Sequence, residues 1–143
     1  MTRGKASEVA LALDAVPLFS ECSQRELRTV AALCTRLDVA AGFRLTRQGT
    51  HDPQCFVVAA GSAAVEIDGR AVGTVGPGDM VGEMSLLDGG PRSATVISLS
   101  PMTLYVMTRG EFRSMMRTNP SIVGKIATSL ARRLRLAQAT SPH

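Results

Sequence analysis

The sequence predicts an α+β domain, in which an antiparallel β-barrel or jelly roll of about eight strands follows N-terminal helices and precedes a long C-terminal helix. Three observations support this fold class. The middle of the chain alternates short apolar segments with glycine- and proline-rich turns about every ten residues. Both ends show the helical spacing of apolar residues instead. The length of 143 residues suits a single domain, which we expect to occupy residues 1–143.

The N-terminal region, residues 1–37, is expected to contain the first helices. A short helix is predicted over residues 7–14, and Pro17 separates it from the next one. Ser23 and Glu26 have the spacing of a capping box, which marks the start of a second helix. Its apolar positions follow helical spacing: Leu27, Val30, Ala31, Leu33 and Cys34.

The central region, residues 38–108, reads as a series of strands divided by turns. Six segments are predicted as strands: FRLTRQ (43–48), CFVVAA (55–60), SAAVEI (62–67), RAVGTV (70–75), SATVISL (93–99) and MTLYVMT (102–108). The pair Asp68 and Gly69 is typical of a tight hairpin turn. Residues 82–90 interrupt the strand pattern, and one or two helical turns are expected over residues 83–87.

The C-terminal region, residues 109–138, returns to helical spacing. A short helix is predicted to end at Asn119, because Pro120 follows it. A long amphipathic helix is expected from Ser121 onward, with arginines beside one apolar face: Ile122, Ile126, Leu130 and Leu134.

Composition restricts the classes of function. The net charge is +4, but basic residues are spread along the chain, and aromatic residues make up only 3%. Nucleic acid is therefore not the expected partner, because neither a basic face nor stacking rings stand out. No segment approaches the ~20 apolar residues of a membrane span, and the N-terminus lacks a signal-peptide core. We expect a cytoplasmic protein.

The cysteine and histidine residues indicate neither a metal site nor catalysis. Three cysteines without CxxC spacing argue against a zinc site or a disulfide framework. The two histidines stand alone, and no nucleophile is paired with a histidine base. We therefore expect no metal, no catalytic residue and no enzyme.

The segment GEMSLLDGGPRS, residues 82–93, has the most distinctive chemistry in the chain. Gly82 precedes a short helix whose first amides suit an anion, and Arg92 can bind the same anion. Glu83 is an acceptor and therefore suits ligand hydroxyl groups. A phosphate ester of ribose would satisfy both side chains. Alternatively, Glu83 and Arg92 pair with each other across the loop.

The order GEMSLL…PRSATV resembles the phosphate-binding cassette of cyclic nucleotide-binding domains, a family that includes catabolite activator protein, protein kinase regulatory subunits and cyclic-nucleotide-gated channels. The likeness extends upstream, where Gly42, Leu45 and Gly49 form a pattern typical of the family and Gly61 separates the two strands that follow it. It covers roughly residues 17–136. It implies a barrel of the double-stranded β-helix type.

By this resemblance, Arg92 binds the exocyclic phosphate oxygens and Glu83 binds the ribose 2′-hydroxyl. Backbone amides near Gly82, Ser85 and Ser93 complete the site. The resemblance implies cAMP as the ligand, with cGMP as the alternative, because Ser93 stands where cGMP-binding members often carry Thr. The C-terminal helix is expected to cover the base, and the candidate capping residues are Leu130, Arg133 and Leu134.

Two main functions follow from the resemblance. In the first, the chain is a sensor in which cyclic nucleotide binding moves the C-terminal helix and signals to an unidentified protein partner. In the second, it is the effector domain of a catabolite-activator-type regulator, although only AQATSPH follows the helix and no helix-turn-helix fits there. A barrel that serves protein contact without nucleotide is a third reading. The C-terminal helix is also a candidate homodimer contact.

Overall fold

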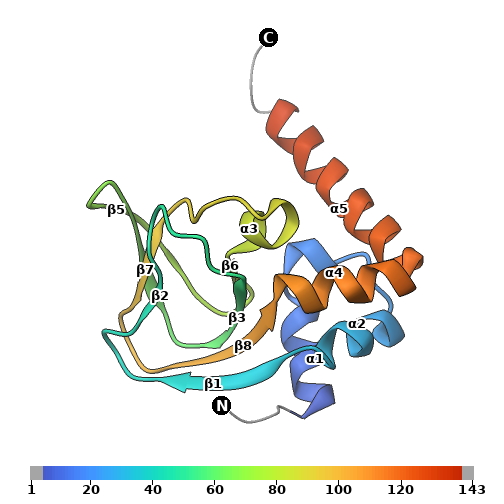
Figure 1. Ribbon diagram of the computed structural model, residues 1–143, viewed down its shortest axis with the longest axis horizontal. Coiled ribbons are helices and arrows are strands. Elements are labelled where there is room, and N and C mark those ends of the chain that lie inside the picture. The colour runs from blue at the N-terminus through green and yellow to red at the C-terminus, as the bar shows by residue number, and fades with distance from the viewer. Residues whose placement is uncertain (1–4, 140–143) are drawn as a thin grey trace.

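The computed structural model describes residues 5–139 and confirms the predicted α+β architecture (Figure 1). Eight strands form two four-stranded antiparallel sheets that together make the barrel, and helices precede and follow it. The barrel and the helices occupy opposite sides of the molecule in Figure 1. The domain limits expected at residues 1 and 143 lie outside the described residues.

The first N-terminal helix lies where the sequence predicts, and the second begins at the predicted cap but ends earlier than its apolar series. The N-terminal helices are α1 (Ala6–Asp14), the short 3₁₀ helix η1 (Pro17–Phe19) and α2 (Gln24–Ala31). The predicted capping box is present, because Ser23 Oγ accepts from the Glu26 amide and Glu26 Oε1 accepts from the Ser23 amide. Helical spacing was expected as far as residue 37, but the chain is already a strand from Thr35.

The first sheet has the order β1-β8-β3-β6, and the second has the order β2-β7-β4-β5. The strands of the first sheet are β1 (Thr35–Val39), β8 (Met102–Thr108), β3 (Gln54–Ala60) and β6 (Met80–Val81). Those of the second are β2 (Arg44–Thr46), β7 (Thr95–Ser98), β4 (Ala63–Ile67) and β5 (Arg70–Val75). Each of the six predicted segments overlaps one strand, and β1 and β6 are additional.

Two apolar clusters lie on opposite faces of the first sheet. The cluster between the sheet and the helices takes Cys55 and Val57 from β3 and continues into the buried faces of α1, α2, α4 and α5. The cluster inside the barrel takes the alternate residues Phe56 and Val58. Because successive strand residues point to opposite faces, β3 is buried on both sides.

The C-terminal helices are α4 (Arg109–Thr118) and α5 (Pro120–Ala139), and the break predicted at Asn119 is confirmed. Along its first half, α5 packs on the N-terminal segment through the buried Ile122 and Ile126. The hydroxyl of Ser129 is also buried and donates to the Pro17 carbonyl at 2.6 Å. This packing carries the second half of α5 past α3 (Glu83–Asp88), the short helix beside the barrel (Figure 1).

Candidate functional site

A pocket of about 240 Å³ lies where the barrel meets α3 and α5. Its apolar walls come from the barrel strands and from the segment before α3, and its polar groups come from the 82–93 segment and from α5. The lining residues are Thr46, Val65, Val75, Met80, Val81, Gly82, Glu83, Met84, Ser85, Arg92, Ser93, Ala94, Val96 and Arg133. One acid and two arginines therefore share a small hollow with otherwise neutral walls.

Arg92 is the most buried charged side chain of this pocket, with 2% of its side chain exposed. Its backbone is fixed by hydrogen bonds to the loop before β3, in which the Arg92 amide donates to Thr50 O and the Gly49 amide donates to Arg92 O. Its Nη2 donates to the carbonyl oxygen of Gln54 and lies 3.7 Å from Asp52 Oδ1. The side chain is thus held from the side of β3.

The remaining nitrogens of Arg92 are not satisfied by the protein. Both Nε and Nη1 are buried without a hydrogen-bond partner among the described residues. The nearest carboxylate, Asp52, is itself 42% exposed and contacts a different nitrogen. A buried donor on a charged group is costly unless an acceptor meets it. The arrangement therefore suits an anion that enters the pocket.

Gly82 makes room for this arginine. Its φ of +87° is a left-handed conformation that favours glycine, and it forms the N-terminal cap of α3. A Cβ atom at this position would collide with Arg92 Nη1 and would lie 3.3 Å from the Gln54 carbonyl oxygen. Both backbone conformation and close packing therefore require glycine here.

Glu83 forms an ion pair with Arg133 of α5, through Oε1 and Nη1. The glutamate side chain is 17% exposed and that of the arginine 45%. The pairing of Glu83 with Arg92, which the sequence left open, is not the arrangement found. Each of the two residues has a different partner, and both line the pocket.

The other residues expected near the ligand also line the pocket. Ser85 is buried in α3, and Ser93 is exposed at the pocket rim. The amides of Glu83, Met84 and Ser85 begin a helix and have no carbonyl one turn earlier in that helix. The site therefore combines backbone donors with one guanidinium and one carboxylate.

Two of the three candidate capping residues lie beside the pocket and not in it. Leu130 and Leu134 line a neighbouring hollow together with Met84 and Leu87. Leu130 is half-buried, whereas Leu134 is 65% exposed. Arg133 is the member of the three that lines both hollows.

Sequence reasoning missed the residues that support Arg92 and those that form the pocket walls. Asp52 and the Gln54 carbonyl hold the guanidinium, and Thr46, which donates to the Ala94 carbonyl at 2.9 Å, lines the pocket. Nothing in the local sequence marks Asp52 or Gln54, because they meet Arg92 only through the fold. The wall valines could have been found from strand alternation, which places every second residue inside a barrel.

No group of three or more metal-ligating side chains occurs within residues 5–139. In the same part of the chain, no helix is both long enough and apolar enough to cross a bilayer.

Comparison with known proteins gives a consistent family match. Residues 36–119, more than half of the chain, match the family described as the cyclic nucleotide-binding domain. The chain is 31% identical to the cyclic AMP receptor protein of Thermus thermophilus over 126 residues, which cover 85% of the chain and 58% of the receptor. It is 33% identical to the Pycsar effector protein XpPycTIR of Xanthomonas perforans over 99 residues, which cover 68% of the chain and 33% of the effector. The chain thus spans less than two thirds of either relative.

Solved structures agree with this match. The N-terminal domain of a transcriptional regulator from Streptomyces coelicolor A3(2) superposes with a TM-score of 0.82 at 27% identity, covering 92% of this chain and 98% of that one. The regulatory domain of Toxoplasma gondii PKA, crystallised with cAMP, superposes with a TM-score of 0.72 at 31% identity, covering 80% of this chain and 46% of that one.

Proposed function

The chain belongs to the cyclic nucleotide-binding domain family, and from this premise we propose that it is a cAMP-binding regulatory module and not an enzyme. The observation that carries the proposal is the buried Arg92, whose Nε and Nη1 have no partner among the described residues. A phosphate that carries negative charge supplies the missing acceptors. We place the module in the cytoplasm.

The ligand is oriented by three kinds of contact. Arg92 binds the exocyclic phosphate oxygens, assisted by the free amides at the start of α3 near Gly82 and Ser85 and by the amide of Ser93. Glu83 accepts a hydrogen bond from the ribose 2′-hydroxyl through a carboxylate oxygen. No metal ion takes part.

The base lies against the apolar barrel wall, which includes Val65, Val75 and Val96. We assign adenine, because the Thermus relative is a cyclic AMP receptor and the Toxoplasma relative was crystallised with cAMP. The hydroxyl of Ser93 at the rim makes cGMP the competing ligand.

Helix α5 is the output element. It borders the pocket through Arg133, and the adjoining residues Leu130 and Leu134 can close over the base when the helix moves toward α3. Binding then shifts α5 because the ligand prefers the closed arrangement. A downstream protein reads the position of α5, or a second copy of the chain packs on it.

A second function places the same module inside a transcription regulator. The supporting observation is the likeness to the Streptomyces N-terminal domain, 98% of which is covered. In that case, α5 leads to a DNA-binding domain, and this chain itself contacts cyclic nucleotide and not nucleic acid.

Calorimetric titration with cAMP and cGMP tests the proposal on the native chain and on Arg92→Ala. We expect the native chain to bind cAMP more tightly than cGMP. The Arg92→Ala variant should lose roughly 100-fold or more in affinity, because the phosphate loses its charged partner.

Arg70→Ala is the matched control, because it removes an exposed arginine of β5 that does not line the pocket. Native affinity is expected for this variant. If the native chain binds neither cAMP nor cGMP, the proposed function is refuted. Equal affinity of the native and Arg92→Ala chains would refute the role of Arg92, and tighter binding of cGMP would overturn only the assignment of the base.

A further inference from the structure

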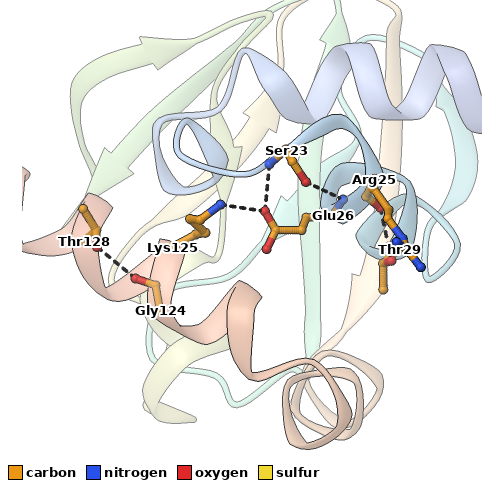
Figure 2. A network of polar contacts seen from close by, with 7 residues as sticks. All are labelled: Ser23, Arg25, Glu26, Thr29, Gly124, Lys125 and Thr128. Carbon is orange, nitrogen blue, oxygen red and sulfur yellow. Dashed lines mark hydrogen bonds and ion pairs between the residues drawn. The ribbon is translucent and has the colours of Figure 1, made fainter.

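Helix α5 is fixed on the N-terminal segment by three polar contacts that follow one another along the helix. Lys125 Nζ lies 3.0 Å from Glu26 Oε1, within the network that Figure 2 shows around Ser23. Ser129 donates to the Pro17 carbonyl at 2.6 Å, and Arg132 Nη1 lies 2.7 Å from Glu21 Oε2. At 3.6 residues per turn, these three positions share one side of the helix.

Arg133 follows directly after the last of these contacts and points to a different neighbour. One residue along a helix is a rotation of about 100°, which turns this side chain from the N-terminal segment toward α3. There its Nη1 pairs with Glu83 Oε1. The pair therefore joins the fixed part of α5 to the acid in the pocket.

Only one of the two carboxylate oxygens of Glu83 is used in this pair. Oε2 forms no hydrogen bond or ion pair with any residue in the described part of the chain. An ionised carboxylate accepts at both oxygens, so one can hold Arg133 while the other accepts from a ligand hydroxyl. The ion pair and a bound ribose are thus chemically compatible.

We infer that Arg133 is a positioning residue for Glu83, which it orients so that the carboxylate receives the 2′-hydroxyl of the nucleotide. This inference rests on the proposed function and specifies how the same site depends on α5. The recognition of ribose is coupled to the docking of α5, because the orienting group comes from that helix. Docking of α5 raises the affinity for a ligand with a 2′-hydroxyl by some factor. By thermodynamic linkage, binding of that ligand favours the docked position of α5 by the same factor.

This role differs from that of a residue that covers the base. A base contact acts on any nucleotide with the same base, whether or not the sugar carries a 2′-hydroxyl. An effect exerted through Glu83 requires that hydroxyl. Comparison of cAMP with 2′-deoxy-cAMP therefore separates the two roles.

The test is a calorimetric titration of the native chain, Arg133→Ala and Arg133→Gln with both nucleotides. Because a partly exposed ion pair contributes modestly, we expect each variant to bind cAMP roughly two- to five-fold more weakly than the native chain. For 2′-deoxy-cAMP, the native chain and both variants should have equal affinity. Arg133→Lys should restore part of the lost cAMP affinity, because it retains the positive charge.

Arg135→Ala is the matched control, since it removes an exposed arginine from the same helix outside both hollows. It should bind both nucleotides as the native chain does. Equal losses for cAMP and 2′-deoxy-cAMP in the Arg133 variants would overturn the inference in favour of a base contact, while the proposed function would stand. Unchanged or tighter cAMP binding by these variants would also overturn it. A native chain that binds neither nucleotide would refute the proposed function itself, and the inference with it.

Discussion

The guanidinium of Arg92 lies directly over the α-carbon of Gly82, in the space that a side chain at that position would occupy. The glycine lies at the start of α3 and the arginine lies beyond its end. Their contact therefore brings the two ends of the 82–93 segment together. The other side of the guanidinium is held by the Gln54 carbonyl oxygen. The Arg92 guanidinium, the proposed phosphate-binding group, therefore owes its position both to its hydrogen bonds and to the space left because Gly82 has no side chain.

Substitution of Gly82 by alanine should abolish nucleotide binding. Its φ of +87° makes any L-residue strained by about 1–2 kcal/mol, and the added Cβ displaces Arg92. Gly42→Ala is the control, because Gly42 has a φ of +86° but open space around the added Cβ. Both variants should lose stability in chemical unfolding, Gly82→Ala at least as much as Gly42→Ala because its Cβ also collides with Arg92, and only Gly82→Ala should lose cAMP affinity in calorimetry. Loss of affinity in both would point to general destabilisation.

Removal of the Ser129 hydroxyl should destabilise the fold by about 1 kcal/mol. The hydrogen bond from the buried Ser129 hydroxyl to the Pro17 carbonyl is lost, although that carbonyl keeps its bonds from the amide and the hydroxyl of Ser20. Alanine's better helix propensity offsets only part of the loss. The adjacent Thr128 is exposed, and its hydroxyl donates to the Gly124 carbonyl of its own helix (Figure 2). Thr128→Ala should therefore leave the free energy of unfolding unchanged or raise it by about 0.5 kcal/mol. Equal losses in the two variants, measured by urea unfolding, would show that the Ser129 hydroxyl is not an anchor.

The Glu26 carboxylate should make stability depend on pH in the acidic range. The Ser23 amide, followed by Lys125 and Ser121, lowers the pKa of Glu26 from 4.5 to about 2. Because the folded pKa is depressed, the contribution is fully present above pH 4.5 and is lost as the pH falls toward 2. The difference in thermal midpoint between the native chain and Glu26→Gln should therefore be largest near neutral pH and shrink across that window. A difference that stays constant with pH would contradict this role.

The three cysteines should differ in reactivity toward a thiol reagent. Burial raises the pKa of Cys34 to about 12 and also raises the pKa of Cys55 and Cys22. Cys22 is 9% exposed, whereas Cys34 and Cys55 are 2% and 0% exposed. Labelling followed by peptide mass spectrometry should find Cys22 modified first, and the other two only as fast as the protein unfolds. Rapid modification of Cys55 in the native protein would contradict the structure of the β3 region.

The sequence predicted those parts of the fold that leave a local pattern. The capping box at Ser23, the break at Asn119 and six of the strands rest on periodicity or on turn residues. The strand β1 does alternate Leu37 and Val39 with polar residues, but it is short and follows directly on the apolar series that ends at Cys34, so the predicted helical region extends into it. The strand β6 has only two residues and depends on pairing with β3, which no local pattern reveals.

The same distinction applies to the site. Glu83 and Arg92 could be singled out because they share one short segment of unusual composition. Their actual partners, Arg133 and Asp52, come from segments that the fold brings close. Spacing along the chain therefore indicated which groups carry charge in the pocket, but it could not indicate how each is held.

The double burial of β3 has a consequence for how such chains can diverge. A strand with one solvent-facing side tolerates drift at every second position, as β5 should, since most of its residues are exposed. In the interior of β3, Cys55 and Val57 face the helices while Phe56 and Val58 face the barrel. Neither the odd-numbered nor the even-numbered positions are therefore free to vary. Related sequences should therefore keep residue volume along β3 even where the pocket has adapted to another ligand, and they should accumulate most of their differences along β5.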